Sequence, residues 1–207
     1  MKDSYNEQEL FWANEFGDEY IVRNTATEIV DSNEALFDEI LSDVPLPNTA
    51  LEIGSNVGLN IKALKRLVPT LSASAVEINA RAAEILDESG LVEKVYNGSF
   101  LESQIPGDFD LVFCKGLLIH INPSDLPDTY SKIAKLASQY VLFAEYYNPS
   151  PVAIDYRGHA NKLFKRDFAG EFLHMFPDFE LIKTGFAYHG GKYPQDDLTW
   201  FLMKKVS

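Results

Sequence analysis

The chain lacks several features that particular classes of protein require. Its 207 residues include one cysteine, Cys114, so an internal disulfide is impossible and a reducing, cytoplasmic setting is expected. No apolar run approaches the length of a membrane span, and the polar, acidic N-terminus does not resemble a signal peptide. The four histidines and the cysteine are scattered without metal-ligand spacing, so we expect no metal.

Basic residues are also scarce. The chain has 18 Lys and Arg against 31 Asp and Glu, which gives a formal net charge of −13. Nucleic-acid binding depends on cations that neutralise phosphates, so we expect no nucleic-acid partner. A charge of this size favours solubility, and 207 residues are enough for one globular domain.

Two nucleotide-binding fingerprints are absent from the glycine-rich stretch T-A-L-E-I-G-S-N-V-G-L-N, residues 49–60. Counted from Gly54, the second and third glycines of G-x-G-x-x-G would fall at Asn56 and Leu59. No G-x-x-x-x-G-K phosphate loop occurs either. A dinucleotide or a nucleoside triphosphate is therefore not the expected ligand.

What is present in this stretch is a strand, a tight loop and a helix. An apolar run at 50–53 predicts a buried strand, and the apolar spacing after residue 60 predicts a helix. Glu52, just before the loop that begins at Gly54, suits a cationic ligand group and would repel a diphosphate. The stretch resembles motif I of class I methyltransferases, whose cofactor S-adenosylmethionine carries an ammonium and a sulfonium. The alternative is an ordinary strand–turn–helix with a surface Glu52.

Two further strands with polar ends follow. Residues 71–77 predict a strand that ends in Glu77, and an acid there accepts hydrogen bonds from ribose hydroxyls in sheets of this kind. The alternative is a solvated strand-end acid. Asn79 can cap the next helix, which should end near residue 90. Residues 95–100 predict a third strand, with Ser99 or the backbone around Phe100 as the candidate for the adenine contact.

The fourth and fifth strands are expected at 109–116 and 140–145, with a helix from Ser124 to about residue 139 between them. Cys114 is most simply a buried structural residue. His120 follows the fourth strand and Glu145 ends the fifth, at the sheet edge where ligands bind in open α/β folds. A satisfied structural histidine is the alternative for His120.

The whole pattern predicts one domain over residues 1–207, an α/β fold. Five alternating β–α units precede a closing antiparallel pair at 179–188 and 198–203. The predicted fold is a doubly wound seven-stranded sheet, mostly parallel with an antiparallel last strand and with helices on both faces. A capping box at 25–28 and a capping Asp167 mark two helix starts.

The N-terminal segment 1–24 is unusually aromatic. Phe11, Trp12 and Phe16 fit one helical face, and Gly17 is placed to end that helix. The segment predicts a helical lid over a ligand, or a helix that only caps the core.

Residues 146–168 predict a long substrate loop inserted after the fifth strand. Loops of this length in compact domains are usually functional or disordered, and the aromatic, cationic composition argues for function. The alternative is a solvated run of charges. The segment gathers the titratable groups Arg157, His159, Lys162, Lys165 and Arg166.

Several segments together are similar to one family. E-F-G-D-E-Y, L-E-I-G-S-N-V-G-L-N, K-G-L-L-I-H-I-N-P, A-E-Y-Y-N-P-S-P-V, Y-R-G-H-A-N-K-L-F-K-R-D-F-A-G and D-D-L-T-W-F resemble the pseudaminic acid biosynthesis-associated methyltransferases across essentially the whole chain. The resemblance implies a class I fold, S-adenosylmethionine as cofactor, and an acceptor among nonulosonic acid sugars or surface-glycan intermediates.

Candidate site residues follow from these patterns. The catalytic candidates are His120, Glu145, Tyr146 and His159. The cofactor candidates are Glu52, Gly54, Asn56, Gly58, Asn60, Glu77, Ile78, Ser99, Phe100 and Lys115. The substrate candidates are Tyr147, Asn148, Arg157, Lys165 and Arg166, because cations in the inserted loop suit an anionic sugar. A monomer or homodimer is expected. A cofactor-binding sensor or scaffold without turnover, or a methyltransferase with an unrelated small-molecule acceptor, are the alternatives.

Overall fold

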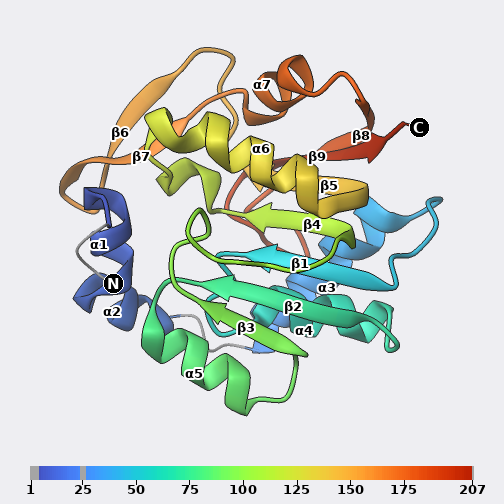
Figure 1. Ribbon diagram of the computed structural model, residues 1–207, viewed down its shortest axis with the longest axis horizontal. Helices are drawn as coiled ribbons and strands as arrows, with labels where there is room; N and C mark the ends of the chain where they lie inside the picture. The colour runs from blue at the N-terminus through green and yellow to red at the C-terminus, as the bar shows by residue number, and fades with distance from the viewer. Residues whose placement is uncertain (1–4, 24–26, 207) are drawn as a thin grey trace.

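The computed structural model describes residues 5–23 and 27–206 and contains a seven-stranded sheet (Figure 1). The strand order is β3-β2-β1-β4-β5-β9-β8. The strands are β1 (Thr49–Ile53), β2 (Ser72–Glu77), β3 (Lys94–Asn97), β4 (Phe109–Lys115), β5 (Ala137–Glu145), β8 (Phe179–Ala187) and β9 (Leu198–Lys205). Strand β9 runs antiparallel to both of its neighbours, and the first five strands pair in parallel. The predicted fold class is confirmed.

Helices cover both faces of this sheet. The helices α3 (Thr27–Leu41), α4 (Leu59–Leu67) and α5 (Ala80–Glu88) contribute to one apolar cluster, and α6 (Leu126–Leu136) and α7 (Phe168–Met175) to the other. Strands between two helical layers have both faces buried, which explains the continuous apolar runs of β1, β4 and β5. No described helix is both long enough and apolar enough to span a membrane.

Helix starts follow the capping signals in two cases. The Oδ1 of Asn79 accepts the N–H of Ala82 at 2.9 Å, and the Oδ1 of Asp167 accepts the N–H of Gly170 at 2.8 Å. The capping box expected at 25–28 lies partly outside the described residues. Helix α6 ends earlier than predicted because Ala137 already pairs with Phe109 in the sheet.

The N-terminal segment forms two helices, α1 (Glu7–Ala13) and α2 (Glu15–Arg23), which we call the lid helices. Gly17 lies inside α2, so the prediction that it ends a helix is wrong. Its missing side chain serves packing: a Cβ atom there would lie 2.0 Å from the backbone oxygen of Trp12 and 2.7 Å from Nδ2 of Asn79. Gly17 thus lets the two lid helices approach each other and α5.

The inserted segment is a β-hairpin, which corrects the prediction of a loop. Strands β6 (Val152–Tyr156) and β7 (His159–Lys165) pair antiparallel, and the hairpin lies beside α1 in Figure 1. Arg157 adopts a left-handed φ of 50° in the two-residue turn, next to Gly158. This turn closes the backbone hydrogen bonds that a structureless loop would have left to water.

Candidate active site

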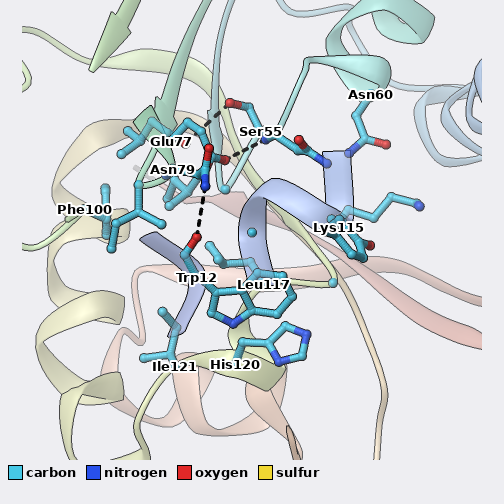
Figure 2. A pocket seen from close by; sticks show the side chains of 18 of the residues that line it. Trp12, Ser55, Asn60, Glu77, Asn79, Phe100, Lys115, Leu117, His120 and Ile121 are labelled. Atoms are coloured by element: carbon cyan, nitrogen blue, oxygen red, sulfur yellow. Dashed lines mark hydrogen bonds between the residues drawn. The ribbon is translucent and has the colours of Figure 1, made fainter. Parts of the chain in front are cut away.

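A cavity of about 420 Å³ lies over the carboxyl ends of β1, β2 and β4. Its walls come from the loop after β1, the loop after β3, η2 (Leu118–His120), the lid helices, α3 and the β8–β9 loop. Figure 2 shows Glu77, Asn79 and Phe100 on one side, Asn60 and Lys115 on the other, and Trp12 and His120 at a third corner. Its position and size fit a small-molecule site of an open α/β sheet.

The glycine loop needs three left-handed backbone positions. Gly54, Asn56 and Gly58 have φ of 76°, 47° and 80°. A Cβ at Gly54 would meet Leu117 at 2.7 Å, and one at Gly58 would meet Leu86 at 2.5 Å, so both glycines also permit close packing. Asn56 replaces a glycine because asparagine tolerates the left-handed region better than most residues. The loop therefore keeps its shape without a third glycine.

Glu77 is the acid that holds this loop against the cavity. Its Oε2 accepts the N–H of Asn56 and its Oε1 the N–H of Asn79, each at 2.7 Å. Burial raises the pKa of the carboxyl group, and the backbone N–H groups oppose that rise. Glu77 lines the cavity at the end of β2, where a ribose acceptor was expected.

Glu52 lies beneath the cavity and is absent from its lining. The Nδ2 of Asn60, which does line the cavity, donates to its Oε1 at 2.7 Å, and its buried Oε2 has no partner in the described chain. Burial raises the pKa of Glu52 to about 8. The residue is therefore placed to act on a ligand through Asn60, which differs from the direct contact expected from the sequence.

The wall beyond Glu77 is formed by Ile78, Ser99 and Phe100. Ser99 and Phe100 are buried, as a contact with a flat, partly apolar base requires. The ammonium of Lys132 lies 4.8 Å from the centre of the Phe100 ring and donates to the backbone oxygens of Phe100 and Ser103. Lys132 thus supports this wall from outside the cavity.

His120 is a neutral histidine with a defined orientation. Its Nδ1 lies 2.7 Å from the backbone oxygen of Lys162, which fixes the proton on Nδ1 and leaves the lone pair on Nε2. The ring lies 4.6 Å from Trp12 and 5.0 Å from Tyr156, centre to centre. Burial lowers the pKa of His120 to about 4. The residue lines the cavity, so Nε2 can accept a proton from a ligand there.

Glu145 has a structural position. Its Oε1 accepts the N–H groups of Leu117 and Leu118 at 3.0 Å, and its Oε2 that of Ile119 at 3.4 Å. The side chain is buried and absent from the cavity lining, and burial raises its pKa to about 7. Glu145 therefore holds the turn that carries His120, and the geometry does not support the expected role of a base.

The other candidates after β5 diverge. Tyr146 is half-buried, and its pKa is raised by burial and by Asp196, Tyr156 and Tyr20 nearby. Tyr147 packs on Phe201 away from the cavity, and the amide of Asn148 donates to Ser150. None of the three lines the cavity, so the expected position of Tyr146 beside the reacting groups is not supported by the cavity lining. The side chain of His159 lies outside what the structure describes.

The hairpin cations do not form one patch. Lys162 bonds Glu7 of α1 at 2.7 Å, and Arg166 bonds Glu171 of α7 at 2.8 Å. Lys165 lies 5.1 Å from the centre of the Tyr146 ring, and Arg157 lies exposed at the turn, 5.6 Å from that of Tyr156. Alternate residues of a strand point to opposite faces, which separates Lys162 from Lys165. The expected joint role of Arg157, Lys165 and Arg166 is thus divided among three environments.

Sequence reasoning missed part of the lining. Asn33, Gln195 and Asp196 line the cavity from α3 and the β8–β9 loop, whereas Trp12 of α1 lies in the segment that the sequence predicts as a lid. The segment D-D-L-T-W-F was noted as part of a resemblance, and its first residue is Asp196. For Asn33, in the middle of α3, no sequence signal distinguishes it from a solvated helix residue.

Comparisons with known proteins identify the class of fold. No protein-family model matches the chain. The release factor glutamine methyltransferase of Fusobacterium nucleatum is 26% identical over 102 residues, which are 49% of this chain and 28% of that protein. The chain therefore aligns with less than a third of that relative's length.

Solved structures resemble the chain over nearly its whole length. The magnesium protoporphyrin IX methyltransferase of Synechocystis PCC 6803, with bound S-adenosylmethionine, has a TM-score of 0.69 at 13% identity, covering 98% of this chain and 99% of that one. The 1,6-didemethyltoxoflavin-N1-methyltransferase of Burkholderia thailandensis has a TM-score of 0.69 at 13% identity, covering 97% and 87%. This chain has the class I methyltransferase fold.

Proposed function

We propose that this chain is an S-adenosylmethionine-dependent methyltransferase that acts on a small molecule. The observation that carries the proposal is Glu77, a buried carboxylate at the end of β2 that faces the cavity and orders the glycine loop through Asn56. An acid at this position of such a sheet is placed for ribose hydroxyls. The fold and the methyltransferase relative support the same activity.

The residues around the cavity fit the cofactor. Ile78, Ser99 and Phe100 form a wall for an adenine, Glu77 lies at the ribose position, and Asn60 and Lys115 supply polar groups at the opposite end. A volume of about 420 Å³ is within the range of pockets that hold ligands of this size. When bound, S-adenosylmethionine supplies an electrophilic methyl group.

His120 is the residue that we assign to the acceptor's proton. Its Nε2 is the basic nitrogen, and its imidazole is held by Lys162 O on one side and Trp12 on the other. An acceptor hydroxyl or amine beside Nε2 would transfer its proton there as the new bond to carbon forms. Trp12 and Gly17 of the lid helices line the cavity, and the role that we assign to these helices is to cover this corner and limit water there during the transfer.

For the acceptor we propose a sugar or sugar-derived acid, of the nonulosonic type used in bacterial surface glycans. The support is the resemblance of the A-E-Y-Y-N-P-S-P-V and Y-R-G-H segments, together with Arg157 and Lys165 near Tyr156 and Tyr146. A cation at the hairpin turn suits an anionic sugar approaching from solvent. Tyr146 directly follows β5, contacts Lys165 of this hairpin through its ring and does not line the cavity; the role that we assign to it is to orient the acceptor from outside that lining.

Calorimetric titration tests the proposal. Wild-type protein should bind S-adenosylhomocysteine and fail to bind NAD. Glu77→Gln should weaken the binding of S-adenosylhomocysteine by about 1.5–3 kcal/mol, because charge-assisted hydrogen bonds are lost. Glu84→Gln, an exposed acid on the neighbouring α5, is the matched control and should bind normally. Binding of NAD without any response to S-adenosylhomocysteine would reject the activity.

The acceptor is tested separately. Mass spectrometry of the surface glycan from the host, with the wild-type protein and with His120→Asn, should differ by one methyl group per modified sugar. An unchanged glycan, with S-adenosylhomocysteine still bound by the wild type, would reject the sugar and retain the methyltransferase.

A further inference from the structure

Lys115 is a cation in the cavity wall that the fold leaves without a partner. It ends β4, is half-buried, and is the only lysine or arginine among the described residues that line the cavity. Its ammonium has no hydrogen bond or ion pair to any residue in the described ranges 5–23 and 27–206. The hairpin cations Lys162 and Arg166 each have a carboxylate partner. A lysine held in this way is available for an anion of a ligand.

None of the carboxylates that the structure describes around Lys115 forms an ion pair with its ammonium group. Glu52 and Glu145 are buried below, and the oxygens of Glu145 are occupied by backbone N–H groups. Burial is the main cause that lowers the pKa of Lys115, and Asp196, Glu52 and Glu145 oppose the change from a distance. A ligand carboxylate at Nζ would supply the contact that these groups do not make.

Three amides fix the wall beside Lys115. Gln195 donates to Asn33 at 3.1 Å, Asn33 donates to Asn60 at 2.8 Å, and Asn60 donates to Glu52 at 2.7 Å. Because every donor in this chain points towards Glu52, the orientation of each amide is set by the buried acid. The chain also ties the β8–β9 loop to α3 and α4, which holds Asp196 at the exposed edge of the cavity.

The positions of the residues around the cavity indicate which part of a ligand would lie near Lys115. Lys115 and Asn60 lie at the end opposite Phe100, with Glu77 on the Phe100 side (Figure 2). A nucleoside on Glu77 and Phe100 would therefore extend its 5′ substituent towards Lys115. Asp196 contributes a negative group at the same end, and Glu52 is sealed off from it.

We propose that Lys115 and Asp196 form the receptor for the amino-acid end of the cofactor. Lys115 binds the carboxylate, Asp196 binds the ammonium, and the amides of Gln195, Asn33 and Asn60 hold the β8–β9 loop that carries Asp196. This inference rests on the proposed function. It assigns the ammonium to an acid of the β8–β9 loop and leaves Glu52, the buried acid of β1 just before the glycine loop, as a positioning residue.

Two ligands that differ only at this end test the proposal. S-adenosylhomocysteine carries the amino-acid group, and 5′-methylthioadenosine keeps the nucleoside but lacks that group. Lys115→Gln and Asp196→Asn should each weaken S-adenosylhomocysteine about 10- to 100-fold by calorimetry, as loss of a charged hydrogen-bond partner does. Both variants should bind 5′-methylthioadenosine like the wild type, within about threefold.

Matched controls are Lys135→Gln, an exposed cation of α6 outside the cavity lining, and Asp197→Asn, the neighbouring acid that pairs with His189. Both controls should bind the two ligands normally. Unchanged S-adenosylhomocysteine affinity in Lys115→Gln and Asp196→Asn would overturn the proposal, and so would an equal loss of both ligands. If the wild type binds neither ligand, the proposed function itself fails, which is a different result from either of these.

Discussion

The two halves of the cavity are built in different ways. The half that we propose for the nucleoside is made by residues at or directly after the ends of consecutive parallel strands, such as Gly54 after β1 and Glu77 at the end of β2. The half that we propose for the acceptor is formed by the lid helices and the turn after β4, and the hairpin packs behind His120 through the backbone oxygen of Lys162. Its ion pair between Glu7 and Lys162 joins residues 155 positions apart. The first half is encoded locally, and the second exists only once distant segments have met.

This difference predicts that the acceptor half can be disabled while the nucleotide half stays intact. His120→Asn keeps a donor for Lys162 O and removes the basic Nε2. Turnover should fall about 10²- to 10⁴-fold, the usual contribution of a positioned proton acceptor. Calorimetry should show S-adenosylhomocysteine binding close to that of the wild type. Normal turnover in this variant would remove His120 from the mechanism.

The lid offers a second way to separate the halves. In Gly17→Ala the new Cβ atom would lie 2.0 Å from the backbone oxygen of Trp12. Helix α1 must therefore move away from α2. Overpacking of this kind costs about 1–3 kcal/mol. Hydrogen exchange should show lost protection in α1 and α2 and unchanged protection in β1, β4 and β5.

Gly191→Ala is the control for the lid, because a Cβ there meets nothing closer than 3.6 Å. It should leave exchange and turnover unchanged. If Gly17→Ala instead loosens the central strands, the lid is part of the main folding unit and the comparison fails.

The sequence could predict the glycine loop, the strands beside it and the helix cap at Asn79 because their signals are short-range. Glycine spacing, strand-end acids and capping residues such as Asn79 each act within a few residues. Asn56 belongs to this loop and adopts its left-handed backbone conformation although it is not a glycine. Glu52 and Glu145 show what such short-range signals cannot predict. Strand periodicity places each acid near the edge of the sheet. Whether the carboxylate faces the cavity or binds buried backbone N–H groups depends on the turn that packs over it.

The hairpin was missed for a related reason. Residues 146–168 have no regular alternation of apolar and polar side chains, and the buried faces of β6 and β7 are determined by contacts with η2 and the lid helices. The charge of a residue such as Lys162 is visible in the sequence, while its partner Glu7 is not. The cations were therefore grouped by proximity in the chain, although the two faces of β7 separate them.

The burial of His120 predicts how the free energy of unfolding depends on pH. Its folded pKa of about 4 lies below the unfolded value, so between pH 6.5 and 4 only the unfolded chain takes up this proton. The free energy of unfolding should therefore fall as pH falls, by about 2 kcal/mol from this group between pH 7.5 and 5. His120→Asn should lack that component in urea titrations at the two pH values. An equal pH dependence in both proteins would show that His120 is not buried as a neutral ring.

The smallest expected effect concerns Arg166, which the sequence grouped with the substrate cations. Its Nε donates to Glu171, whose other oxygen accepts the hydroxyl of Tyr130, so the guanidinium links the end of the hairpin to α7, and none of these three residues lines the cavity. Arg166→Met should lower the free energy of unfolding by about 0.5–1 kcal/mol, as loss of a partly exposed ion pair does, or roughly 1–4 °C in Tm. Acceptor kinetics should not change. Arg157→Ala, at the exposed turn, should have the reverse pattern: normal Tm and a Michaelis constant for the acceptor raised about tenfold or more. If Arg166→Met raised that constant and left Tm unchanged, the guanidinium would have to leave Glu171 to reach the substrate, and the separation of the hairpin cations argued from β7 would be wrong.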